Sequence, residues 1–158
     1  MRVVSFDQAS KISGWSYWEN SKYISSGTID LSKSKDTTDE RAKKMGLAIC
    51  DKISELKVDR VFIENVQQQS GVATVILLAR IQGMIIGWCY AHSIQVDVLA
   101  PTQWRAALEY RQGPGVKRSE LKKQSEDYVL EHLDLDSLSE DENEAICIGY
   151  GAHKIFNI

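Results

Sequence analysis

The sequence predicts an α/β protein with a mixed five-stranded sheet flanked by helices, and three observations favour this class. The N-terminal part holds three segments rich in aromatic and β-branched side chains, separated by short links. Further along, two short apolar segments alternate with helical patterns, and the last third reads as helices. A chain of 158 residues suits one core, so we expect a single domain over residues 1–158.

The three N-terminal strands are expected at residues 2–7, 14–18 and 23–29. Residues 2–7 alternate, which places Val4 and Phe6 on one face. The other two segments are dense in the side chains that strands favour. Because the links between the three segments are short, they predict an antiparallel meander.

Helical and strand patterns then alternate. Thr37 and Glu40 form a capping-box pattern that begins a helix. Residues 60–64 have the apolar centre of a buried strand, residues 71–92 read as a long helix, and residues 94–99 read as a fifth strand. Strands joined through helices prefer parallel, right-handed pairing, so the sheet is expected to be mixed.

The C-terminal part is predicted to be helical. Pro101 suits the first turn of a helix, and a Gly-Pro-Gly break precedes a basic helix over residues 116–133. A last helix is expected over residues 140–156. The expected order of elements is that of the ribonuclease H-like fold: three strands, a helix, a strand, a helix, a strand and terminal helices. This order by itself leaves the function open.

The long helix over residues 71–92 is apolar enough to be weighed as a membrane span. Arg80 and Gln82 near its middle argue against that, so no membrane partner is expected. We expect one stripe to pack on the sheet and another, with Arg80, Gly83 and Gly87, to form a homodimer interface. The alternative is a helix buried all round in a monomer.

The charges are unevenly distributed. The chain has 19 basic and 22 acidic residues, yet nine acids and no Lys or Arg lie between Glu126 and Glu144. The remaining chain holds 13 acids against 19 bases, a net charge of +6. This pattern suits a polyanionic substrate bound with metal ions, and equally suits a solvated acidic surface.

Three cysteines, Cys50, Cys89 and Cys147, lie far apart in apolar stretches. They lack CxxC spacing and even pairing, which argues against disulfides and a zinc site. No basic and then apolar leader precedes the first expected strand. These observations predict a cytoplasmic protein with reduced, buried thiols.

Four carboxylates are expected to converge. Asp7 ends the first strand and Glu64 ends the fourth, so parallel pairing of these strands brings both to one sheet edge. Asp141 and Glu144, three residues apart on the last helix, can reach the same place. An all-oxygen cluster suits Mg²⁺, with Mn²⁺ as the alternative, and two ions per site suit phosphodiester hydrolysis.

Each acid also has an ordinary interpretation. Asp7 precedes Gln-Ala-Ser and can be a turn residue, and Asp141 can complement the dipole of a first helical turn. Glu64 has no such local reason to follow Val-Phe-Ile directly. The combination therefore carries more weight than any single residue.

Three segments, VVSFDQASKISGWSY, VFIENV and DENEAICIGYGAHK, resemble the RuvC family of Holliday junction resolvases, particularly its compact bacteriophage-encoded members. The resemblance spans nearly the whole chain. It implies a metal-dependent endonuclease of DNA recombination and repair, a homodimer that nicks branched DNA in pairs and leaves 5′-phosphate and 3′-hydroxyl ends. Asp7, Glu64, Asp141 and Glu144 match the four catalytic, metal-binding acids of the family, which more commonly has Asp at the fourth position.

The resemblance also implies basic DNA contacts after the fifth strand. Arg105 and Arg118 fall near the usual lysines of the family. The predicted phosphate contacts are Arg105, Arg111, Lys117, Arg118 and Lys122. For Lys122 a solvated helix face is the stronger alternative, and Trp104 is expected to be a buried anchor rather than a base-stacking residue.

The loop after Glu64 departs from the family. Many members present an aromatic wedge there, whereas this chain has three glutamines, Gln67, Gln68 and Gln69. Amides can hydrogen-bond to exposed base edges, so we expect a DNA contact. The alternative is a polar lead-in to the next helix.

Other functions stay open at this point. A second ribonuclease H-like nuclease, acting on RNA–DNA hybrids or replication forks, fits the same acids. A non-catalytic protein that binds branched DNA would use the basic segment alone. A phosphotransferase of the actin-like type is disfavoured, because no glycine-rich phosphate loop follows Asp7.

Overall fold

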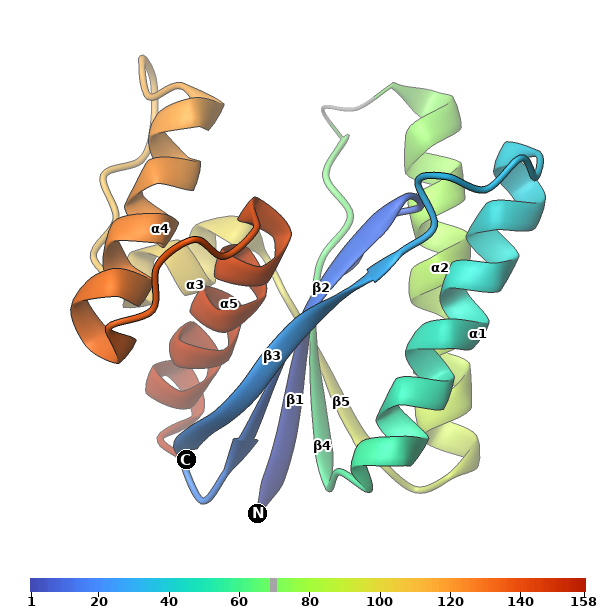
Figure 1. Ribbon diagram of the computed structural model, residues 1–158, viewed down its shortest axis with the longest axis horizontal. Helices are drawn as coiled ribbons and strands as arrows, with labels where there is room; N and C mark the ends of the chain where they lie inside the picture. Colours follow the sequence, from blue (N-terminus) through green and yellow to red (C-terminus); the bar gives the residue numbers. More distant parts are fainter. Residues whose placement is uncertain (69–70) are drawn as a thin grey trace.

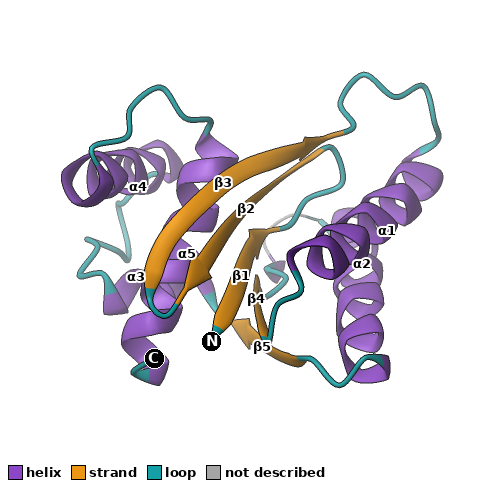
Figure 2. Ribbon diagram, turned by 60° about the horizontal axis from the view of Figure 1, so that its bottom comes forward, coloured by secondary structure: helices purple, strands orange, loops and turns teal. Residues whose placement is uncertain are grey.

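The computed structural model describes residues 1–68 and 71–158. Five strands form one sheet in the order β3-β2-β1-β4-β5. Helices α1 and α2 cover one face, and α3, α4 and α5 lie on the other (Figure 1; Figure 2 shows the two layers from below). The elements are β1 (Arg2–Asp7), β2 (Ile12–Glu19), β3 (Lys22–Asp30), α1 (Thr38–Leu56), β4 (Arg60–Glu64), α2 (Val72–Ala91), β5 (Gln95–Leu99), α3 (Pro101–Ala107), α4 (Arg118–Leu133) and α5 (Glu140–Phe156).

The pairing of the strands confirms the predicted mixed sheet. Strand β2 pairs antiparallel with both β1 and β3, whereas β4 pairs parallel with β1 and β5. Two predicted helix starts are also confirmed. The Thr37 side chain accepts a hydrogen bond from Glu40 N at the start of α1, and Pro101 is the first residue of α3. The three cysteines are buried free thiols, as predicted.

Each face of the sheet has its own core. Val4 and Phe6 pack toward α1 and α2, in a cluster that includes Ile49 and Ile81. Val3 belongs to the opposite cluster, which also holds Trp18, Phe62, Trp104 and Ile146. The central strand is therefore buried on both faces, as expected of parallel pairing in an α/β protein.

Helix α2 is the one helix, among the residues that the structure describes, long and apolar enough to cross a membrane. It packs on the sheet, where Leu77, Ile81, Ile85 and Cys89 are buried. Only 22% of its most apolar 18-residue stretch is buried in the single chain. The alternative of a helix buried all round is therefore wrong.

The outer stripe of α2 contains the residues predicted for a dimer interface. Ile76 and Tyr90 are 47% and 72% exposed, and a Cβ at Gly83 or Gly87 would meet no atom within 4 Å. Arg80 is exposed too and pairs with Asp39 of α1 at 2.9 Å. In the single chain this stripe is exposed, so a second copy could pack against it.

Candidate active site

Two of the four predicted acids lie side by side at the end of parallel strands. Phe6 of β1 is in register with Ile63 of β4, so the next residues, Asp7 and Glu64, leave the sheet at the same edge. They line one cavity of about 430 Å³ together with Asp141 and Glu144 of α5. The structure thus brings all four acids to one place, and their roles in metal binding and catalysis stay a prediction.

Close contact with the sheet positions α5. Gly14 lies opposite Asp7 in the antiparallel pair, and a Cβ there would stand 1.9 Å from the carbonyl oxygen of Asp141. One turn later, Ser5 and Ser16 donate hydrogen bonds to the Ala145 carbonyl at 2.8 and 3.0 Å. The first turns of α5 are therefore held against β1 and β2 by small side chains.

Glu64 is held by two residues outside the acid cluster. The indole N–H of Trp104 donates to Glu64 Oε1 at 2.9 Å, and Trp104 is fully buried, as predicted. The Gln8 side chain bonds to the backbone of Glu64 on both sides, donating to its carbonyl and accepting from its N–H at 3.1 Å. Sequence reasoning missed both roles, although a buried indole N–H needs a partner and Gln8 directly follows Asp7.

The cluster disfavours its own negative charge. Burial raises the pKa of Asp7 well above its usual value of 3.8, and the charges of Glu144, Glu64 and Asp141 raise it further. Burial also raises the pKa of Glu64, against the opposing effects of the Trp104 hydrogen bond and the Arg105 charge. Burial raises the pKa of Asp141, and the charge of Lys122 acts in the opposite direction. Protons or cations are needed for these acids to coexist.

Arg105 supplies a cation inside the cavity. Its guanidinium lies 3.6 Å from Glu144 Oε1 and 4.0 Å from Glu64 Oε1, with 17% of the side chain exposed. Its buried Nε has no hydrogen-bond partner within the described part of the chain. Arg105 thus belongs to the acid cluster rather than to an open basic face, which the sequence did not predict.

The residues fit a divalent metal by donor chemistry rather than by ready-made geometry. Within residues 1–68 and 71–158, no three His, Cys, Asp or Glu side chains stand in a metal-binding arrangement. Carboxylate oxygens that line one cavity and repel one another are nevertheless the ligands that Mg²⁺ and Mn²⁺ prefer. Arg105 would have to share Glu64 and Glu144 with such an ion.

The predicted DNA contacts divide into two groups. Gln67, Arg118 and Lys122 line the active-site cavity, together with Arg105. Gln68, Arg111 and Lys117 are exposed and do not line it, and Gln69 lies outside the described residues. Arg111 is paired with Glu120 and Lys122 with Glu140, so Lys122 is not a freely solvated side chain.

Comparisons with known proteins find solved structures of the same fold. The RuvC from Thermus thermophilus, solved in complex with a Holliday junction substrate, matches with a TM-score of 0.78 at 13% identity, over 99% of this chain and 95% of that one. A fowlpox virus resolvase, solved with Holliday junction DNA, gives 0.66 at 17% identity, over 100% and 99%. The yeast mitochondrial Holliday junction resolvase Ydc2 gives 0.61 at 13%, over 96% and 77%.

At these identities the structural matches concern the fold, and they confirm the predicted ribonuclease H-like architecture. No curated protein matches the chain in sequence. The sequence profile of crossover junction endodeoxyribonuclease RuvC, however, matches residues 3–149, nearly the whole chain. The chain therefore belongs to the RuvC family of crossover junction endodeoxyribonucleases.

Proposed function

We propose that the protein resolves four-way DNA junctions by metal-dependent hydrolysis, with each subunit of a homodimer cutting one strand. The observation that carries the proposal is the meeting of Asp7, Glu64, Asp141 and Glu144 in a cavity that Arg105, Arg118 and Lys122 also line. Their environment disfavours four negative charges without cations, which favours metal binding over a merely structural role. Membership of a nuclease family supports the same activity.

The four acids would hold two Mg²⁺ ions, or Mn²⁺ in their place. Bound ions of this kind supply Lewis acidity, and they lower the pKa of water for attack on a phosphodiester. Trp104 and Gln8 fix the position of Glu64, and Gly14 allows the first turn of α5 to bring Asp141 to the same edge. These contacts hold Glu64 and the first turn of α5 at one sheet edge, and a bound ion would draw the carboxylates into their final positions.

Basic residues beside the acids would bind the substrate. Arg105 and Arg118 line the cavity with guanidinium groups suited to phosphate oxygens. Gln67, which also lines the cavity, would meet a base edge near the cut. Branched DNA is the partner that this combination favours over a uniform duplex, since the family acts on crossover junctions.

A homodimer would explain paired cuts. The exposed stripe of α2, with Gly83 and Gly87 open to close approach, supports an interface between two copies. A two-fold axis through that interface would match the approximate two-fold symmetry of a four-way junction. A bacteriophage origin and action in the host cytoplasm remain predictions.

The test is cleavage of a synthetic four-way junction with labels on each strand. We expect symmetric nicks that ligase can seal, lost in EDTA and restored by Mg²⁺. Glu64→Gln should slow cleavage by about a thousandfold or more while junction binding persists, because one metal ligand is lost. Glu142→Gln is the matched control, since Glu142 bonds to Ser26 at 2.7 Å and does not line the active-site cavity.

Three outcomes would overturn the proposal. Wild-type rates for Glu64→Gln would remove the assigned site. A preference for forks or RNA–DNA hybrids over junctions, in a panel of labelled substrates at equal concentration, would favour the broader nuclease. Binding without any metal-dependent cleavage would favour a non-catalytic junction-binding protein.

A further inference from the structure

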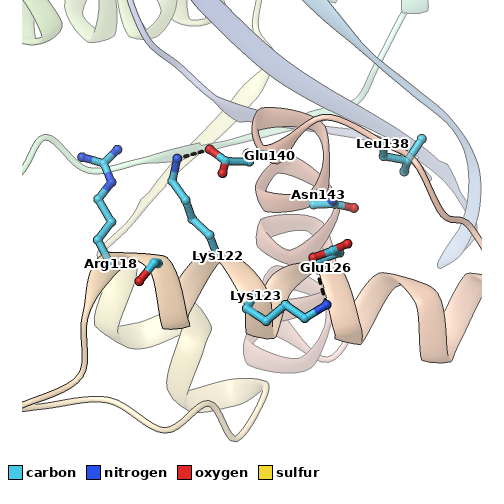
Figure 3. Close-up of a pocket in the computed structure, with 8 residues that line it drawn as sticks. Arg118, Lys122, Lys123, Glu126, Leu138, Glu140 and Asn143 are labelled. Carbon is cyan, nitrogen blue, oxygen red and sulfur yellow. Dashed lines mark hydrogen bonds and ion pairs between the residues drawn. The ribbon is translucent and has the colours of Figure 1, made fainter.

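A second cavity, of about 560 Å³, lies beside the active site between α4 and the start of α5 (Figure 3). Arg118 and Lys122 line both cavities, so the two share a wall. The four acids assigned to catalysis do not line the second cavity. It is therefore adjacent to the active site and separate from it.

Asn143 is the feature of this cavity that points to a ligand. It lines the cavity and is only 5% exposed, yet no hydrogen bond joins its side-chain amide to a protein group in the described part of the chain. Its amide atoms are not among the fully buried unpartnered atoms of the described residues, so they open onto the cavity, where water or a ligand can satisfy them. Asn143 lies between Asp141 and Glu144 in the sequence, but it lines the second cavity and not the active-site cavity.

The walls around Asn143 suit an anion. Arg118, Lys122 and Lys123 bring three positive charges to the cavity, against the two acids Glu126 and Glu140. In Figure 3 each lysine reaches one of these acids: Lys122 pairs with Glu140, and Lys123 lies 3.1 Å from Glu126. Lys123 also lies 2.9 Å from Asp127, so an arriving anion would compete with carboxylates for both lysines.

The backbone adds to the positive character. Helix α4 begins here, and its N-cap residue, Lys117, makes no side-chain capping bond. The first-turn N–H groups of this 16-residue helix therefore have no cap from that side chain. Helix N-termini in this condition favour phosphate groups.

We infer that this cavity is a second phosphate subsite, which binds a backbone phosphate next to the scissile one on the same DNA strand. The inference rests on the proposed function, because it places the scissile phosphate at the four acids. Since Arg118 and Lys122 line both cavities, a strand leaving the active site passes directly over the second one. Asn143 donates to the flanking phosphate, and Lys123 neutralises it.

The first test replaces the phosphates around the cut, one at a time, with uncharged methylphosphonates. Junction affinity is measured by fluorescence anisotropy in Ca²⁺ with the cleavage-deficient Glu64→Gln protein. One flanking methylphosphonate should weaken binding about tenfold, the effect of one charge-assisted hydrogen bond. Asn143→Leu or Lys123→Ala, added to that protein, should weaken binding to natural DNA similarly and make it insensitive to that methylphosphonate.

Lys52→Ala is the matched control. Lys52 also pairs with a glutamate three residues on, Glu55 at 2.8 Å, but lies on α1 across the sheet. It should bind like the parent protein. Lys123 is 62% exposed, so its variant keeps the test valid if Asn143→Leu fails to fold. Unchanged affinity in Lys123→Ala, with every flanking methylphosphonate tolerated, would overturn the inference.

A second measurement separates this inference from the proposed function. Inorganic phosphate is titrated into wild-type protein, and the Asn143 side-chain amide is followed by ¹H–¹⁵N NMR, with Asn143→Leu providing the assignment. A saturable shift that Lys123→Ala weakens and Lys52→Ala does not is expected even if junctions are not cut. No shift would mean that the cavity is not an anion site. A shift without any methylphosphonate effect would assign it to free phosphate and overturn the DNA role.

Discussion

The two faces of the sheet are built differently. On the α1 and α2 face, side chains such as Phe6, Ile49 and Ile81 fill an apolar core. On the α5 face, Gly14 meets the helix backbone directly, and Ser5 and Ser16 hydrogen-bond to it. The first face is held by contacts between side chains, whereas on the second the helix that carries two of the acids is fixed by contacts with its backbone.

The largest effect is expected where the α5 face is tightest. Gly14→Ala should lower junction cleavage by on the order of a hundredfold, because a Cβ 1.9 Å from the Asp141 carbonyl must push α5 away from Asp7. Lys52→Ala, on α1 across the sheet from α5, should leave cleavage unchanged. Single-turnover rates with a labelled junction measure both variants. Equal rates would show that α5 is not held by this contact.

The next effect concerns the outer side of α2. Gly83→Leu should weaken self-association by at least about tenfold, since the side chain would occupy the space through which two helices approach. Sedimentation velocity over a concentration series measures this. Wild-type protein that remains monomeric throughout would remove the homodimer from the proposed function.

A smaller effect is expected on the unfolding free energy, and it should differ between buried residues of the two faces. Ser16→Ala should cost about 1–3 kcal/mol of unfolding free energy, because the Ser16 hydroxyl bonds to Ala145 O and accepts from Trp18 Nε1 at 2.7 Å. Ile49→Val should cost about 0.5–1.5 kcal/mol. Urea denaturation gives both values. Only the serine variant should also slow cleavage, and an equal loss of activity in both would contradict the comparison.

The smallest effect has the opposite sign. The raised pKa of Asp7 means that its protonated form favours folding below the usual value of 3.8, and that this contribution is lost as pH rises through the folded-state pKa. Asp7→Asn should therefore stabilise the protein in EDTA at pH 7.5, because the neutral amide avoids the cost of a buried charge beside the other acids.

The advantage of Asp7→Asn should shrink toward pH 4, and it should shrink again when Mg²⁺ is added to both proteins. Urea denaturation at the two pH values, with and without Mg²⁺, measures it. A variant less stable than wild type in EDTA at pH 7.5 would show that the acids do not repel one another as described.

The strands and the sheet edge could be predicted because their signals are local. Alternation and β-branched content located β1 and β4, and parallel pairing then required Asp7 and Glu64 to emerge together. Thr37 and Pro101 gave helix starts for the same reason.

What the sequence could not predict depends on contacts between distant residues. Gly14 touches Asp141, Trp104 bonds to Glu64, and Arg105 lies between Glu64 and Glu144. No periodicity links such positions, since each contact joins two elements whose relative placement comes from the whole fold. Arg105 was accordingly predicted on a basic face and is found among the acids.

Asn143 and Glu144 are consecutive residues of α5 that line different cavities. In a regular helix neighbouring residues differ by about 1.5 Å in height and 100° in direction, so their offset is a constant of the backbone. The distance between these two lining residues is therefore fixed by one rigid helical turn. It does not depend on the conformation of a loop.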